Sequence, residues 1–275
     1  MRMLFVGVDL AWGEGTVARL ANETGLVSLD ESGRVLDARW ARGGNDALGC
    51  IEDMAGATEA VLVAVDAPLV VRNRTSLREC ERQVGQRYGR WKVSANATNL
   101  DSPRQAGVSL LRDLEAGGFA YSDGFAGPPM SGRHVFECYP YTTIVGAAEL
   151  GYDTERPRYK RKPKSLTSAQ WRPSRAAACD ELVRRVARLE SVDPPLLIAS
   201  HPTTAALASS PAPLDDLPYK HREDLLDALI CAWTASLWHR HGTDSCQVLG
   251  EQDGSARAPT IIAPARPEQR PSAGA

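Results

Sequence analysis

Three apolar runs in the chain each end in a single carboxylate residue. The runs begin at residues 4, 61 and 134, and the carboxylates that close them are Asp9, Asp66 and Glu137. Short apolar runs bounded by turn residues predict buried strands. A carboxylate at the end of a buried strand has lost much of its water and requires a partner or a cation. Asp is also common in turns that follow strands, so for Asp9 the pattern alone leaves a metal ligand and a turn residue equally open.

The remaining pattern alternates between the periods of strands and of helices. Residues 16–22, 26–30 and 34–40 read as extended segments, and tight turns between them predict an antiparallel start. Apolar positions at helical spacing predict helices over residues 45–55, 75–84, 103–115, 141–150, 173–190, 196–208 and 218–240. Residues 246–249 and 260–263 are expected to pair as strands. This mixture indicates an α/β fold.

The length and composition indicate one large domain. The chain has 275 residues, of which 43% are hydrophobic. We expect a single domain over residues 1–263, with insertions over about 70–132 and 151–217, and a disordered tail over 264–275. No stretch approaches the roughly 18 unbroken apolar residues of a membrane helix, and Met1 leads almost directly into the first strand, without room for a signal peptide. Six scattered cysteines without a CxxC pair favour reduced thiols in the cytoplasm.

A net charge of −2 conceals two basic segments. Residues 72–92 contain seven basic residues against two acidic ones, and residues 156–175 contain eight basic residues and no acidic one. A local excess of this kind attracts a polyanion regardless of the net charge. The candidate nucleic-acid ligands are Arg72, Arg74, Arg78, Arg82, Lys160, Arg161, Lys162 and Lys164. The alternatives are an exposed helix whose arginines pair with Glu79 and Glu81, and a solvated loop.

The helix predicted over 218–240 adds two further carboxylates. Asp224 and Asp227 are three residues apart, so their side chains lie on one helical face. Apolar residues flank Asp227, and a lone carboxylate in such surroundings is costly unless it is paired or binds a metal. Strand ends gather at one edge of a sheet, and a helix packed there can add its own acids. Oxygen-only ligands suit Mg²⁺ or Mn²⁺.

Four motifs in this order resemble a known family. They are residues 7–12 (GVDLAW), 65–69 (VDAPL), 137–140 (ECYP) and 221–229 (HREDLLDAL). The pattern resembles a bacterial and archaeal family of predicted RNase H-like nucleases, domain of unknown function 429, over about residues 3–240. The last motif is also similar to the closing helix of Holliday-junction resolvases in that superfamily.

The resemblance implies a fold and a set of roles. The fold would be an RNase H-like mixed sheet, in which three antiparallel strands precede parallel ones and helices flank the sheet. Asp9 matches the first-strand metal ligand, Asp66 the acid of the fourth strand, and Asp227, assisted by Asp224, the acid of the closing helix. Glu137 belongs to the family's Glu-x-Tyr-Pro motif and is expected to be an auxiliary ligand. The implied activity is hydrolysis of nucleic-acid phosphodiesters with bound Mg²⁺ or Mn²⁺.

Two other function classes stay open at this point. The first is a phosphotransferase of the actin-like ATPase and sugar-kinase class, which needs a Gly-rich phosphate loop. Its candidate loop, residues 13–15, is short, and Pro68 offers no backbone N–H after Asp66. The second is a catalytically inactive protein that binds nucleic acid through the two basic segments. The complete set of acids favours the nuclease. The sequence indicates neither the type of nucleic acid nor an oligomeric state.

Overall fold

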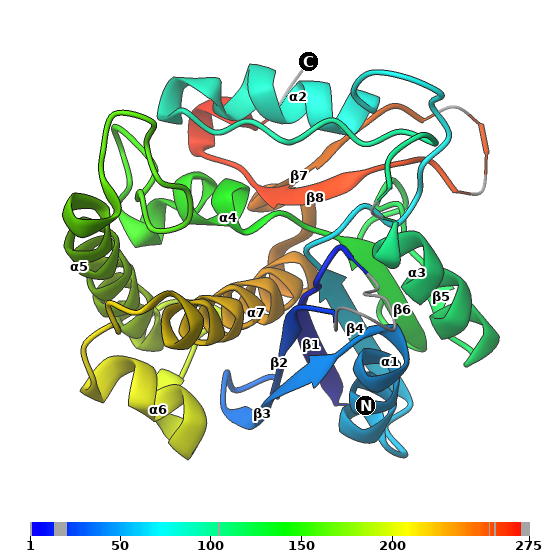
Figure 1. Cartoon of the computed structure of the whole chain (residues 1–275). Coiled ribbons are helices and arrows are strands. Elements are labelled where there is room, and N and C mark those ends of the chain that lie inside the picture. Colours follow the sequence, from blue (N-terminus) through cyan, green and yellow to red (C-terminus); the bar gives the residue numbers. More distant parts are fainter. Residues whose placement is uncertain (1, 14–20, 104, 253, 256, 271–275) are drawn as a thin grey trace.

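A six-stranded mixed sheet forms the centre of the molecule, in the order β3-β2-β1-β4-β6-β5 (Figure 1). The computed structural model describes residues 2–13, 21–103, 105–252, 254–255 and 257–270. The strands are β1 (Met3–Asp9), β2 (Glu23–Leu29), β3 (Val35–Arg42), β4 (Ala60–Val65), β5 (Ala120–Tyr121) and β6 (Arg133–Glu137). Strands β1, β2 and β3 pair antiparallel, whereas β4 joins β1, and β6 joins β4, in parallel. The predicted α/β class and the antiparallel-then-parallel order are confirmed.

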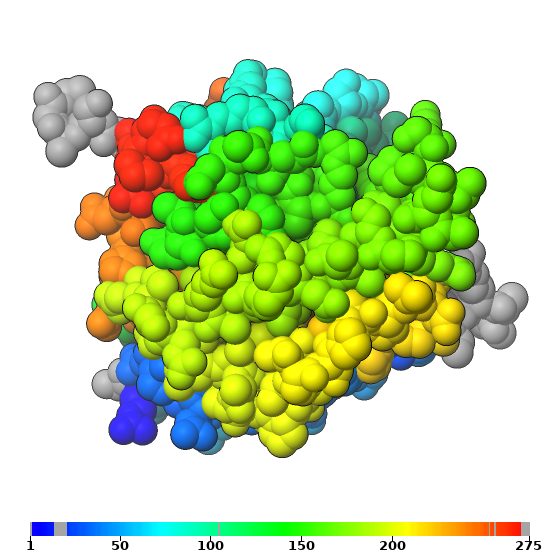
Figure 2. Space-filling model, turned by 90° about the vertical axis from the view of Figure 1, so that its left-hand side faces the viewer, coloured from blue at the N-terminus to red at the C-terminus, as the bar shows by residue number. Residues whose placement is uncertain are grey.

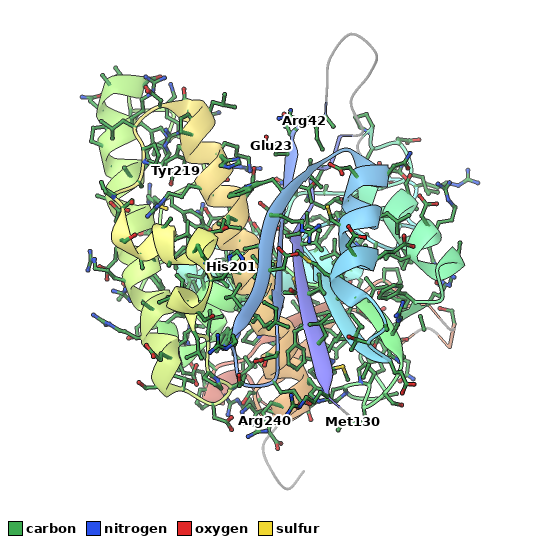
Figure 3. The ribbon with its side chains drawn as sticks, turned by 90° about the horizontal axis from the view of Figure 1, so that it is seen from below. Glu23, Arg42, Met130, His201, Tyr219 and Arg240 are labelled. Carbon is green, nitrogen blue, oxygen red and sulfur yellow. The ribbon has the colours of Figure 1, made fainter. Side chains whose placement is uncertain are left out.

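The sheet separates two hydrophobic cores, because alternate residues of each strand point to opposite faces. Leu4, Val6 and Val8 of β1 face helices α1 (Gly44–Ala55) and α3 (Ala106–Ala116). Met3 and Phe5 face helix α7 (Asp216–His241). Figure 3, the view from below, shows the strands between these two helical layers.

Helix α7 crosses the sheet at close range and is buried over most of its length. Two glycines permit this approach. A Cβ atom on Gly7 would lie 2.0 Å from the carbonyl oxygen of Ala228, and one on Gly25 would lie 2.2 Å from that of Asp224. Any larger residue at either position would push α7 off the strands.

The insertions and the C-terminal part surround this centre. They comprise α2 (Glu79–Tyr88), η1 (Gly89–Trp91), α4 (Pro140–Gly146), η2 (Ala148–Leu150), α5 (Ser168–Ala187), η3 (Arg188–Ser191), η4 (Ile198–Ser200), α6 (Pro202–Ser209), η5 (Gly242–Asp244), the antiparallel pair β7 (Cys246–Leu249) and β8 (Ile261–Pro264), and η6 (Pro267–Gln269). Segments α5 and α6 cover the lower part of one face, in yellow-green and yellow in Figure 2. No helix among the described residues is long and apolar enough to cross a membrane, and all six cysteines are buried free thiols.

Three sequence predictions need correction. Helix α2 begins at Glu79 rather than at Thr75, because Glu81 Oε2 accepts a hydrogen bond from the backbone N–H of Arg78 just before the first turn. Helix α5 begins at Ser168, before Pro173, because Thr167 and Gln170 form a capping box.

The third correction concerns the tail, which is ordered as far as residue 270. Arg266 is buried there and donates hydrogen bonds to the carbonyl oxygens of Val145 and Tyr152. Residues 271–275, and most of the expected extended segment 16–22, lie outside the described residues.

Candidate functional site

Parallel pairing of β1 with β4 brings Asp9 and Asp66 to the same edge of the sheet. Asp9 is the last residue of β1, and Asp66 directly follows β4. The backbone N–H of Asp66 donates a 2.8 Å hydrogen bond to the carbonyl oxygen of Val8, which fixes the two acids side by side. Both are almost buried, with exposed fractions of 8% and 7%.

Helix α7 adds three more carboxylates to this edge. Asp224 and Asp227 are buried at 1% and 0% exposure, and Glu223 beside them is also buried. Because Gly25 admits the backbone of Asp224 onto β2, the first turns of α7 lie next to the end of β1. Asp9, Asp66 and Asp224 line the same pocket. Asp9, at the end of β1, thus lies between Asp66 after β4 and the acids that α7 brings to β2.

Two lysines lie among these acids. Lys160 Nζ contacts Asp227 Oδ2 and lies 3.9 Å from Asp66 Oδ2. Lys220 Nζ contacts Asp224 Oδ1 and lies 4.0 Å from Asp9 Oδ2 and 3.2 Å from Glu223 Oε1. The cluster therefore holds five carboxylates (Asp9, Asp66, Glu223, Asp224 and Asp227) and two ammonium groups, so acid remains in excess.

The protonation equilibria reflect this excess. Burial, together with the Asp9 carboxylate, raises the pKa of Asp224 to about 9, although Lys220 opposes the shift. Burial also raises the pKa of Asp66 well above its usual range and that of Asp227 to about 7, against the attraction of Lys160. Burial disfavours the charged form of Lys160, but the carboxylates of Asp227, Asp9 and Asp66 outweigh it and raise the lysine pKa. Further positive charge at this point would lower the carboxyl pKa values.

The chemistry of the donors fits a hard divalent cation. All the donors are carboxylate oxygens, which Mg²⁺ and Mn²⁺ prefer. Asp224 Oδ2 is buried and accepts no hydrogen bond from any described residue. However, no three His, Cys, Asp or Glu side chains in the described part of the chain are arranged to hold a metal ion directly. The donors fit a cation in type, and their lysine partners must move for the ion to enter.

A loop before α5 also contacts the cluster. The hydroxyl of Tyr159 donates a 2.6 Å hydrogen bond to Asp227 Oδ1. The hydroxyl of Tyr219 in turn donates to the carbonyl oxygen of Tyr159, also at 2.6 Å. Tyr159 and its neighbour Lys160 thus bind Asp227 from a loop that is far from α7 in sequence.

Four carboxylates of the cluster, Asp9, Asp66, Glu223 and Asp224, and both lysines line a pocket of about 290 Å³, whereas Asp227 is fully buried behind it. Its wall combines acids, cations and aromatic rings: Asp9, Leu10, Ala11, Trp12, Asn22, Glu23, Asp66, Ser94, Asn96, Tyr139, Tyr141, Arg156, Lys160, Arg161, Lys220, Glu223 and Asp224. The cluster therefore opens to a cavity that holds both cations and aromatic surface.

Glu137 is engaged by a different partner. Its two oxygens accept hydrogen bonds from Arg78 Nη1 at 2.8 Å and Nη2 at 2.6 Å, and Oε2 also accepts one from the Leu69 N–H. Glu137 and Asp66 line a small neighbouring cavity of about 40 Å³. The expected auxiliary ligand is thus adjacent to the cluster, but its oxygens are bound by an arginine.

The expected role of Arg78 as a surface phosphate ligand is wrong for the same reason. Its guanidinium group is buried between Glu137 and Glu81. The other expected ligands of the first basic segment are exposed: Arg72 donates to Ser255, Arg82 pairs with Glu79, and Arg74 is on the surface. None of these four arginines lines the pocket as its described residues define it.

The second basic segment behaves differently. Lys160, which we expected to bind nucleic acid, lies within the carboxylate cluster with only 18% of its side chain exposed. Arg161 is exposed at the pocket wall and donates to Asn96 Oδ1 at 2.8 Å. Lys162 and Lys164 are exposed. This segment therefore supplies Lys160, one of the two cations that contact the acids, and Lys220 of α7 is the other.

Sequence reasoning missed Lys220, Glu223 and Tyr159. Lys220 precedes Asp224 by four residues, a spacing that places both on one helical face and could have indicated the pair. No local signal identifies Tyr159, because only the tertiary fold brings its loop to Asp227.

Comparison with known proteins yields one match. A family model described as a protein of unknown function (DUF429) matches residues 7–253. No curated protein sequence and no solved structure matches the chain.

Proposed function

Because this chain belongs to the DUF429 family of proteins of unknown function, we propose its activity from the site: it is a metal-dependent nuclease that hydrolyses nucleic-acid phosphodiesters. The observation that carries the proposal is the convergence of Asp9, Asp66 and Asp224 on one pocket from two parallel strands and one helix, with Asp227 joined to Asp66 through Lys160. A stable fold gains nothing from five buried carboxylates with two lysines, since uncompensated buried acids destabilise it.

The acids would hold Mg²⁺ or Mn²⁺, with Asp9 as the shared ligand and Asp66, Asp224 and Asp227 around it. A bound divalent ion activates water and stabilises charge that develops on phosphoryl oxygens. The chain's own contribution is to hold these four carboxylates in a recess from which most water is excluded. Arg156 and Arg161 at the wall are placed to bind phosphate oxygens and orient the chain to be cut.

The arrangement of the sheet supports an RNase H-like assignment. The antiparallel β1, β2 and β3, followed by parallel β4 and β6 with α7 across the face, follow the order that the sequence resemblance implies. The assignment remains part of the proposal. The phosphotransferase alternative gains no support, since Pro68 has no N–H to offer a phosphate, and Glu14 and Gly15 lie outside the described residues.

The test is cleavage of labelled nucleic acids by the purified full chain. Single-stranded, duplex, hybrid and branched substrates are incubated with EDTA, Mg²⁺ or Mn²⁺. We expect cleavage only with metal, and its loss in Asp9→Asn but not in Asp244→Asn, which alters an exposed acid outside the pocket. The absence of metal-dependent cleavage by the folded wild-type protein, or undiminished cleavage by Asp9→Asn, would contradict the proposal. Binding of ATP without cleavage would favour a phosphotransferase instead.

A further inference from the structure

We infer that the pocket accepts a single nucleic-acid strand, with its bases against Trp12 and Tyr139, and excludes an intact duplex. The inference rests on the proposed function, because it assigns the substrate class of the same site. Four features carry it: the depth of the acids, the size of the pocket, the aromatic wall and the position of the cations.

The acids are recessed rather than displayed on an open surface. Each of the four proposed metal ligands is at most 8% exposed. The pocket above them measures about 290 Å³, at the lower end of the range for small-molecule sites. To place one phosphate of a duplex in this recess, the rest of the double helix would have to stay outside it. The major groove alone is about 12 Å wide. A single strand can turn one phosphate into a recess of this size.

Two aromatic side chains of the wall are available for contact. Trp12 and Tyr139 are both half-buried and line the pocket as well as the small neighbouring cavity. Each ring is held at its polar atom: Trp12 Nε1 donates to the carbonyl oxygen of Asp66 at 3.2 Å, and the Tyr139 hydroxyl donates to that of Ser94 at 3.3 Å. Fixed aromatic faces beside a phosphate site are what single-strand binders use to stack bases.

One cation of the wall lies against Tyr141, whose ring centroid is 5.9 Å from that of Tyr139. The Arg156 guanidinium lies 4.4 Å from the ring centroid of Tyr141, and its Nε donates to the carbonyl oxygen of Lys92. Arg161 is held by Asn96. Lys92 and Asn96 come from the same connecting segment after η1, so both arginines are attached to one wall. Aromatic rings on which bases stack, together with arginines that bind the phosphate backbone of the nucleic acid, would form a track for one strand.

The first experiment measures binding of the full-length wild-type protein to fluorescent oligonucleotides. A strand of about 12 nucleotides and the duplex of the same sequence are compared by anisotropy, as DNA and as RNA, with EDTA and separately with Ca²⁺. We expect the single strand to bind at least about tenfold more tightly than the duplex. Equal or tighter binding of the duplex, or no binding of either form, overturns the inference.

Variants of the wall locate the bound strand. Trp12→Ala and Tyr139→Ala are each expected to weaken single-strand binding by about five- to 150-fold, the range for loss of one base–aromatic stack. Tyr139→Phe keeps the ring and should retain most of the affinity. Phe125→Ala is the matched control, because Phe125 is also half-buried but lines a different cavity. Unchanged affinity in both alanine variants overturns the assigned position of the strand.

Cleavage assays separate this inference from the proposed function. Metal-dependent cleavage restricted to intact duplex overturns the single-strand inference and leaves the nuclease proposal standing. Preferential binding of single strands without metal-dependent cleavage of any substrate supports the binding track and contradicts the nuclease proposal.

Discussion

Two buried groups of charges lie side by side in this molecule, and their hydrogen bonding differs. In the first, Arg78 lies between Glu81 and Glu137, and each of the four carboxylate oxygens accepts at least one hydrogen bond. In the second, five carboxylates share two lysines, and Asp224 Oδ2 accepts no hydrogen bond from any described residue. Both groups are acidic and both are buried, so burial and charge alone do not distinguish them.

The difference supports a structural role for the Arg78 group and the proposed catalytic role for the acids around Asp9. The Arg78 group holds the turn after β4, because Arg78 Nη1 also donates to the carbonyl oxygen of Val70 and Glu137 accepts from the Leu69 N–H. A saturated network of this kind gives a cation no free oxygen. The acids around Asp9 retain a free oxygen, and three of them have raised pKa values, so a divalent cation would take the place of protons that they hold.

The largest expected effect is on stability, in Arg78→Met. Removing the guanidinium leaves Glu81 and Glu137 buried without a countercharge, so the free energy of unfolding should fall by about 3–5 kcal/mol. Urea denaturation at pH 7 measures the change. The matched control is Arg82→Met on the same helix, whose exposed pair with Glu79 should contribute at most about 1 kcal/mol. Equal losses in the two variants would show that the Arg78 group is not the structural one.

The next effect is on activity, in Asp227→Asn. Because charge stabilisation by a bound metal contributes several kcal/mol, we expect metal-dependent cleavage to fall on the order of 10³-fold. The free energy of unfolding should change little or rise, since the variant removes one of the excess buried acids. Single-turnover cleavage and urea denaturation are measured on the same preparation. A variant that loses stability but keeps its cleavage rate would assign Asp227 to the fold.

The sequence predicted the fold better than it predicted the site. Asp9, Asp66, Asp224 and Asp227 could be found because each ends or interrupts an apolar element, and the β1 and α7 patterns fix where those elements meet. Glu137 carries the same local signal as Asp66, yet its partner Arg78 is 59 residues away in sequence. Lys160 belongs to the same basic run of the sequence as the exposed Lys162 and Lys164. The sequence pattern does not predict which of these lysines is buried, because tertiary contacts such as that of Tyr159 with Asp227 determine it.

A smaller effect is expected on the pH dependence of stability, in Asp224→Asn. The pKa of Asp224 is about 9 in the folded protein and 3.8 without its folded surroundings. Between these values the folded state holds a proton that the unfolded state releases, so the free energy of unfolding falls as the pH rises from about 4 to about 9. Asparagine removes this slope, and the variant should be more stable than wild type at pH 9 by about 1–2 kcal/mol.

Urea denaturation at pH 6 and pH 9 in EDTA measures the difference between wild type and Asp224→Asn. The control is Asp244→Asn, which should follow the wild-type pH profile because Asp244 is exposed. An Asp224→Asn protein less stable than wild type at pH 9 would mean that neighbouring partners hold the acid in its charged form.

The smallest expected effect is on metal affinity, in Lys220→Met. Lys220 contacts Asp224 and lies 4.0 Å from Asp9, so its ammonium group competes with a divalent cation for the same oxygens. Its side chain is 49% exposed, which screens the interaction to about 1 kcal/mol, or about fivefold in affinity. Titration calorimetry with Mn²⁺ should therefore show tighter binding in Lys220→Met than in wild type. Weaker binding would mean that Lys220 orders the carboxylates for the metal instead of competing with it, and the lysines would then belong with Arg78 among the groups that organise the fold.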